Sequence, residues 1–192
     1  ASIVSHLGTD LVDSNPAEVP TGTTERTPYF VCIGTIEPRK NHAFLLDIWD
    51  EMGEQAPGLV IAGARGWKNE EVFDRLDALP ANGPICEAAG LSDGALAALV
   101  EQSAGVLFPS HAEGFGLPAT EAAACGVPII VNDLQVLREL LGDIPIYACV
   151  SDRYLWINKI NELAGVRPNA RRQQPFVPPT WDAHFKTVLR LT

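Results

Sequence analysis

The sequence has few basic residues and no apolar run long enough to span a membrane. Lysine and arginine number 14 against 24 aspartates and glutamates, so the formal net charge is −10 over 192 residues. A surface of that sign repels a phosphate backbone, and we therefore expect no nucleic-acid partner. A membrane-spanning helix needs roughly 20 apolar residues. We expect a cytoplasmic protein whose association with the inner membrane, where it occurs, is peripheral.

Cysteine and histidine are also sparse, and neither is arranged as a metal site. The four cysteines are Cys32, Cys86, Cys125 and Cys149. They form no CxxC pair, and three lie in or beside apolar runs, where cysteine behaves as a small hydrophobic residue. We expect free thiols. The four histidines form no HxxxH or HxH pair, so we expect no metal held by the protein. His42 and His184 are expected on the surfaces of helices.

The chain does contain short apolar runs that alternate with amphipathic stretches. The expected strands cover 29–34, 58–63, 84–90, 105–110, 127–133 and 144–149, and the expected helices cover 41–52, 69–79, 91–104, 118–126, 134–142, 151–165 and 181–191. Nearly continuous apolar strands between helices are typical of a parallel sheet covered on both faces. We therefore predict an α/β fold with a doubly wound, Rossmann-like parallel sheet. Ser92 and Ser151 are expected to cap two of the helices.

The stretch "HAEGFGLPATEAAACG" (111–126) lies where ligands of such sheets bind, after the carboxyl end of a strand. Two glycines let the backbone turn and approach a ligand. Pro118 and Gly126 bracket a helix. Backbone N–H groups of Phe115, Gly116 and Leu117, and of the residues after Pro118, would bind an anion at the helix start.

Two glutamates flank this helix start, with Glu121 expected in the first helical turn. Carboxylates aimed at a phosphate would repel it, but they can accept hydrogen bonds from hydroxyl groups. A nucleotide sugar offers both chemistries, with a diphosphate between two polyols. We therefore predict that Glu121 holds the ribose hydroxyls and Glu113 the sugar hydroxyls, with the diphosphate over the helix start between them.

Other loops that follow expected strands contain cations and a glycine at which the backbone could come close to a ligand. In "GTIEPRKN" (34–41), a strand ends at Gly34, and Arg39 and Lys40 follow shortly after. Two adjacent cations there would neutralise a diphosphate and stabilise its charge as a leaving group. "AGARGW" (62–67) offers Gly63 for close approach and Arg65 as a further cation.

Three more residues could lie near the ligand. Trp67 could pack beneath a base or anchor its loop. In "AGLSD" (89–93), backbone groups around Leu91 could read a nucleobase, although Ser92 there is equally a helix cap. His111 precedes Glu113 and could approach the sugar.

Several stretches of the chain, taken in order, strongly resemble the nucleotide-sugar-binding half of retaining GT-B glycosyltransferases of family 4, the glycosyl transferases group 1. These stretches are "GTIEPRKN", "LVIAGARGW", "AGLSDGALAALV", "GVLFPSHAEGFGLPATEAAACGVPIIVND" and "RELLGD". Glu113 and Glu121 match the family's E-x7-E motif. The resemblance implies that Glu113 and the backbone of 115–117 hold the sugar, that Glu121 binds the ribose, and that Arg39 and Lys40 hold the diphosphate. It covers roughly residues 1–165.

The resemblance further implies transfer with retention of configuration, by a front-face mechanism with no firm protein nucleophile. The donor would be GDP-mannose by preference or a UDP-sugar, with no other cofactor and no essential metal. Thr35 departs from the family, which often has an arginine at that position. Neutralisation of the diphosphate would therefore depend on Arg39 and Lys40. We expect a donor domain at 1–165 and a C-terminal segment at 166–192 with a terminal helix.

We also expect the acceptor-binding N-terminal domain, which would meet a glycan or lipid-linked glycan, to lie outside this chain, so that the isolated domain binds donor without transferring sugar. The alternative is a non-catalytic module that binds a nucleotide or nucleotide sugar. A dinucleotide oxidoreductase is disfavoured because "EGFGLP" has only two of the three glycines of GxGxxG.

Overall fold

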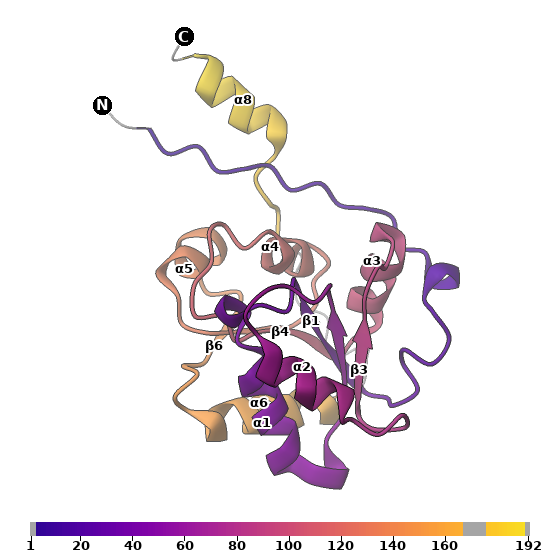
Figure 1. The fold of residues 1–192 in the computed structure, drawn as a ribbon. Helices are drawn as coiled ribbons and strands as arrows, with labels where there is room; N and C mark the ends of the chain where they lie inside the picture. Colours follow the sequence, from indigo (N-terminus) through magenta and orange to yellow (C-terminus); the bar gives the residue numbers. More distant parts are fainter. Residues whose placement is uncertain (1–2, 167–175, 191–192) are drawn as a thin grey trace.

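The computed structural model describes residues 3–166 and 176–190. Its six-stranded sheet has the order β3-β2-β1-β4-β5-β6, and every neighbouring pair is parallel. The strands are β1 (Tyr29–Ile33), β2 (Gly58–Ala62), β3 (Ile85–Ala88), β4 (Gly105–Phe108), β5 (Ile129–Val131) and β6 (Ile146–Tyr147). Helices lie on both sides of the sheet (Figure 1). The predicted doubly wound α/β fold is therefore confirmed.

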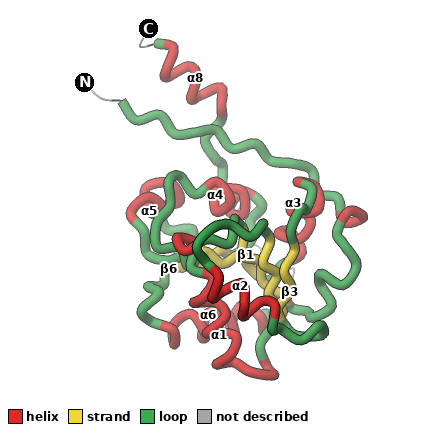
Figure 2. Tube along the Cα trace, in the orientation of Figure 1, coloured by secondary structure: helices red, strands yellow, loops and turns green. Residues whose placement is uncertain are grey.

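The helices follow the strands in the predicted alternation (Figure 2). They are α1 (His42–Met52), α2 (Glu70–Asp77), α3 (Asp93–Gln102), α4 (Leu117–Ala124), α5 (Gln135–Leu141), α6 (Arg153–Gly165) and α8 (Trp181–Leu189), with short 3-10 helices η1 (Pro16–Glu18), η2 (Pro38–Lys40) and η3 (Gly53–Gln55). The strands and most helices are shorter than the sequence predicted, because glycines, prolines and other residues at the ends of the predicted ranges lie in loops.

Successive side chains along each strand face opposite sides of the sheet, and this alternation divides the core into two layers. Phe30 and Cys32 of β1 point to one face, where they join a cluster formed with α1, α2 and α6. Tyr29, Val31 and Ile33 point to the other face and pack with α3, α4 and α5. Successive side chains of a strand face opposite ways, so a strand buried on both faces must be apolar throughout. This explains the unbroken run "YFVCI".

The strand order reverses direction at the centre of the sheet. From β1 the chain moves outward to β2 and β3, and it then returns to place β4 on the other side of β1. The loops leaving β1 and β4 therefore run to helices on opposite faces, α1 and α4. Such a switch point leaves a crevice outside the carboxyl ends of the two strands, where ligands bind in folds of this kind. Both loops carry predicted site residues.

Local signals at the helix ends were mostly read correctly. The Ser92 hydroxyl accepts from the backbone N–H of Ala95 and caps α3 as predicted. Gly126 follows the end of α4 with a φ of 68°, a conformation that glycine adopts without strain. The prediction for α6 was wrong by one residue, because the side chain of Asp152, not Ser151, accepts from the N–H of Leu155.

The predicted surface position of His42 is also wrong. His42 is the first residue of α1 and is 1% exposed. Within the part of the chain that the structure describes, neither ring nitrogen has a hydrogen-bond partner. Burial lowers the pKa of His42 to about 4, and the positive charge of Lys40 adds to this effect. The imidazole is therefore neutral at ordinary pH.

The N-terminal segment and α8 run together away from the sheet (Figure 1). The Thr9 N–H donates to the Pro179 carbonyl at 3.0 Å. Nδ1 of His184 lies 3.0 Å from the carbonyl oxygen of His6, so His184 is half-buried rather than fully on the surface. The division at residue 165/166 stays a prediction, and the stretches 167–175 and 191–192 lie outside the described residues.

We predict that Trp156→Ala lowers the free energy of unfolding by about 3–5 kcal/mol, as large cavities in cores do. The Trp156 indole is fully buried, packs edge-on against Phe44 and donates to the Ala148 carbonyl. Tyr154→Ala, on the exposed side of the same helix, should change it by less than about 0.5 kcal/mol. Urea unfolding of both variants, with Trp156→Phe as an intermediate, measures the difference. Equal losses at the two positions would contradict this account of the core.

Candidate functional site

The loops after β1 and β4 are joined to each other at the carboxyl edge of the sheet. The backbone N–H of His111 donates to the carbonyl of Arg39 at 2.9 Å. The side-chain amide of Asn41 donates to the carbonyl of Pro109 at 3.1 Å. From β5, Asn132 donates to the carbonyl of Ser110 at 2.9 Å. These bonds fix residues 39–41 against residues 109–111.

Glu113 lies between the two predicted cations. Lys40 Nζ is 2.8 Å from Glu113 Oε1, and a terminal nitrogen of Arg39 is 3.0 Å from Oε2. The same Arg39 nitrogen also donates to the carbonyl of Ala112. The Glu113 side chain is 6% exposed and that of Arg39 is 43% exposed. The structure therefore brings together all three residues for which the sequence predicted a catalytic role.

The environment of Glu113 keeps its carboxylate ionised. Burial by itself would raise the pKa of Glu113. The hydrogen bond from Lys40 and the charges of Lys40 and Arg39 act in the opposite direction, and the net effect lowers the pKa below its ordinary value. A carboxylate held in this way is a weak base.

Two glycines allow Lys40 and the neighbouring loop to approach closely. Gly34 has a φ of 132°, and a Cβ at that position would lie 3.1 Å from the Lys40 side chain. At Gly63 a Cβ would lie 2.1 Å from the carbonyl oxygen of Gly34. Gly63 was expected to make room for a ligand. The structure corrects this, because its missing side chain makes room for the backbone after β1.

The glycine turn before α4 is where the sequence predicted it, but Glu121 lies further along the helix than expected. Gly116 precedes the helix with a φ of 85°, and α4 begins at Leu117. The N–H groups of Ala119 and Thr120 both donate to the Gly116 carbonyl. Glu121 is therefore the fifth helical residue and lies in the second turn rather than in the first turn, as the sequence analysis expected.

Glu121 lines a separate hollow of about 300 Å³ between α3 and α4. Ile33, at the end of β1, and the segment 10–12 complete its wall. Asp10 and Asp93 bring two more carboxylates to the same hollow. Burial raises the pKa of Glu121, and the charge of Asp93 raises it further. The two motif glutamates thus face different surroundings on either side of the start of α4.

Arg65 is not brought into the Glu113 cluster. One of its terminal nitrogens lies 2.6 Å from Asp77 and 2.7 Å from Glu87, so its charge is already neutralised by two acids. Arg39 and Lys40 are also paired with acids, so this pairing does not exclude a ligand contact, and the expected role of Arg65 as a further cation stays a prediction.

The remaining predicted residues lie around the loops at the carboxyl edge. Phe115 packs against the α3–α4–α5 core, with its ring centroid 6.1 Å from that of His6. Leu91 packs against the same core, and the side chain of His111 is exposed. Thr35 contacts the loop after β2, where a Cβ on Gly66 would lie 2.7 Å from its methyl group. Their roles toward a ligand stay predictions.

Sequence reasoning missed Glu37 and gave Trp67 no firm place. Glu37 lies inside the quoted "GTIEPRKN" and accepts from Arg39 at 2.6 Å and from the Trp67 indole at 3.1 Å. An acid two residues before an arginine was the available signal, but only the fold shows that Trp67 reaches the same carboxylate. The Ser110 hydroxyl, also missed, is buried under the same loops.

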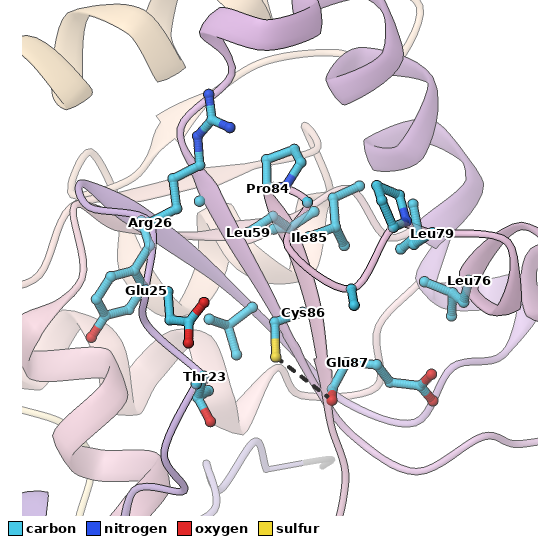
Figure 3. A pocket seen from close by; sticks show the side chains of 17 residues that line it. Thr23, Glu25, Arg26, Leu59, Leu76, Leu79, Pro84, Ile85, Cys86 and Glu87 are labelled. Atoms are coloured by element: carbon cyan, nitrogen blue, oxygen red, sulfur yellow. Dashed lines mark hydrogen bonds between the residues drawn. The ribbon is translucent and has the colours of Figure 1, made fainter.

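A second hollow, of about 230 Å³, opens at the other edge of the sheet, beside the amino ends of β2 and β3 (Figure 3). Leu59, Ile85 and Cys86 line it, and the Cys86 thiol points to the carbonyl of Glu87. None of the residues predicted to bind a ligand lines it.

Among the described residues no group of three His, Cys, Asp or Glu side chains could hold a metal, and no helix is both long and apolar enough to cross a membrane.

The chain is similar to known proteins in sequence and in fold. The family model for glycosyl transferases group 1 matches residues 15–149. The serotype-specific mannosyltransferase WbdA of Escherichia coli is 34% identical over 145 residues, which are 70% of this chain and 18% of that protein. The O-antigen chain mannosyltransferase B of Escherichia coli is 34% identical over 128 residues, 65% of this chain and 33% of that protein. The chain thus spans a third or less of either relative.

Solved structures share the fold at low identity. Anabaena Alr3699/HepE in complex with UDP-glucose superposes with a TM-score of 0.67 at 15% identity, over 97% of this chain and 51% of that one. The catalytic domain of starch synthase IV from Arabidopsis thaliana, bound to ADP and acarbose, gives 0.67 at 12% identity, over 91% of this chain and 39% of that one.

Glu113→Gln and Glu121→Gln should change the pH dependence of stability in opposite directions. The pKa of Glu113 is lowered, so its stabilising contribution is present above the ordinary value of 4.5 and is lost as the pH falls through the folded pKa. The pKa of Glu121 is raised, so the corresponding contribution is present below 4.5 and is lost as the pH rises through the folded pKa.

Urea unfolding from about pH 3.5 to about pH 7 tests whether the two substitutions change the pH dependence of stability in these opposite directions. The stability of the wild type relative to Glu113→Gln should increase with pH, and its stability relative to Glu121→Gln should decrease. Parallel curves for the wild type and both variants would show that neither environment perturbs its glutamate.

Proposed function

Because the chain belongs to the glycosyl transferases group 1 family, we propose that it is the donor-binding half of a retaining glycosyltransferase that transfers a hexose from a nucleotide-diphosphate sugar. The observation that carries this proposal is the cluster of Arg39, Lys40 and Glu113 at the switch point of the sheet. A half-exposed guanidinium and a lysine ammonium lie there beside the loop that leads to α4. This is the edge at which phosphate-containing ligands bind in doubly wound sheets.

In this proposal Arg39 and Lys40 bind the diphosphate and stabilise its charge as the sugar leaves. Both cations are engaged with Glu113 before a ligand enters. An ammonium group has three N–H donors and a guanidinium group has five, so both cations can also donate to phosphate oxygens while they remain paired with Glu113. Preorganised donors near the leaving oxygen stabilise developing charge without a further reorganisation cost. Backbone N–H groups at the start of α4 supply additional anion contacts.

Glu113 is better suited to orient the sugar than to attack it. Both of its oxygens accept hydrogen bonds from cations, and its pKa is lowered. These conditions weaken a carboxylate as a nucleophile and as a general base. We therefore assign Glu113 to hydrogen bonding with hydroxyls of the transferred hexose, and we propose a retaining reaction without a covalent intermediate on this residue.

Glu121 is proposed to hold the ribose of the donor. It lines a hollow that reaches the end of β1, where the cation-bearing loop begins. A nucleoside placed there would have its phosphates directed toward Lys40. Solved structures with this fold support a nucleotide ligand, since one is a complex with UDP-glucose and another is bound to ADP and acarbose.

We propose a mannose-type donor, with GDP-mannose preferred and a UDP-sugar as the other choice, and no separate cofactor. The support is the naming of two relatives as mannosyltransferases, at 34% identity each. The acceptor is proposed to be a glycan or lipid-linked glycan bound mainly by a second domain. The protein is proposed to act in the cytoplasm or at the inner membrane surface.

Lys40→Ala should weaken nucleotide-diphosphate binding by about 10- to 100-fold, because a charge-assisted contact to phosphate is lost. Isothermal titration of the chain with GDP, UDP, ADP and their sugars measures this effect. The matched control is Lys159→Ala, which removes another lysine paired with a glutamate, on α6. Binding by the wild type that survives Lys40→Ala unchanged would contradict the phosphate role, and no binding of any nucleotide would contradict the proposed function.

Removing a ribose hydroxyl should mimic the loss of Glu121. The wild type should bind the 2′-deoxy or 3′-deoxy form of its preferred nucleotide about tenfold more weakly, the value of one hydrogen bond to a charged group. In Glu121→Ala the ribo- and deoxynucleotides should bind equally. If the variant still discriminates between them by the full factor, another group reads the ribose.

A further inference from the structure

Glu37 uses both carboxylate oxygens on two different donors. Oε1 accepts from a terminal nitrogen of Arg39 at 2.6 Å, and Oε2 accepts from the Trp67 indole N–H at 3.1 Å. The Glu37 side chain is 14% exposed. This acid therefore joins the loop after β1 to the loop after β2 at the edge that carries the site.

Arg39 is held from two sides by these contacts. One terminal nitrogen pairs with Glu37, and the other donates to Glu113 and to the Ala112 carbonyl. An exposed arginine otherwise loses side-chain entropy when a ligand fixes it. A guanidinium fixed in advance loses less of this freedom on binding.

The loop that carries Trp67 is built against the Glu37 loop. Ile36 donates its backbone N–H to the Ala64 carbonyl at 2.9 Å, and Gly66 donates to the Ile36 carbonyl at 3.2 Å. Gly66 lies so close to Thr35 that any side chain there would collide with it. Trp67 itself is 59% exposed, so core packing does not explain its position. Its polar edge is directed to Glu37.

We propose that Glu37, held by Trp67, positions Arg39 as a phosphate ligand of the donor site. This inference rests on the proposed function. Glu37 acts through Arg39 and does not itself contact the phosphate, which its charge would repel.

The chemistry of the two donors gives a specific test. Arg39 and Trp67 both donate, so residue 37 must offer two acceptors. Glutamine offers one acceptor, and its NH2 group would face one of the donors. Glu37→Gln must therefore lose at least one of the two bonds. Phenylalanine at position 67 removes the indole donor, so in Glu37→Gln/Trp67→Phe the amide oxygen can bond Arg39 without conflict.

The experiment is isothermal titration of the preferred nucleotide diphosphate into the whole chain and its variants. Glu37→Gln should bind about three- to tenfold more weakly than the wild type, and Trp67→Phe less than about threefold more weakly. The double variant Glu37→Gln/Trp67→Phe should bind within about twofold of Trp67→Phe. Binding by the double variant that is weaker than by Glu37→Gln alone would overturn the proposal.

A second comparison shows whether Glu37 acts through Arg39. In an Arg39→Ala background, Glu37→Gln should cause no further loss of affinity. An equal loss with and without Arg39 would overturn the positioning role, and so would wild-type affinity in Glu37→Gln alone. Thermal unfolding of each variant identifies any that do not fold. A wild type that binds no nucleotide diphosphate contradicts the proposed function itself, whereas normal wild-type binding with an unaffected Glu37→Gln contradicts only this inference.

Discussion

The ion pairs that Glu113 forms with Lys40 and Arg39 are the interaction on which the site depends. They join two loops that are more than 70 residues apart in sequence, with Lys40 Nζ 2.8 Å from one oxygen of Glu113 and Arg39 3.0 Å from the other. The parallel sheet makes this contact possible, because β1 and β4 are neighbours whose carboxyl ends lie at one edge. Without the carboxylate, a largely buried lysine would be left without its charge partner, which is costly in a low-dielectric environment.

The same cluster is balanced in charge before a ligand enters. Arg39 and Lys40 contribute two positive charges, and Glu37 and Glu113 contribute two negative ones. These four side chains together therefore carry no net charge, and the chain as a whole has a net charge of −10. An ammonium group has three N–H donors and a guanidinium group has five, so both cations can bond a further acceptor while they stay paired with the carboxylates.

The two glutamates of the motif differ because their surroundings differ. Glu113 faces cations that lower its pKa, whereas Glu121 lies in a hollow with Asp93, where burial and like charge raise its pKa. Environments that separate the pKa values of two identical groups commonly separate their roles. The two cations hold Glu113 in its charged form, whereas burial and the charge of Asp93 favour the protonated form of Glu121.

The sequence alone determined the parallel α/β fold, because unbroken apolar strands such as "YFVCI" require a sheet buried on both faces. It also located Arg39, Lys40 and Glu113, since cations and acids after strand ends are visible as local patterns. Tertiary structure decided which of these groups meet. Arg65 is neutralised by Asp77 and Glu87, Gly63 makes room for a neighbouring backbone, and Trp67 reaches Glu37. Each of these outcomes depends on contacts between residues that are separated in sequence, which no local pattern encodes.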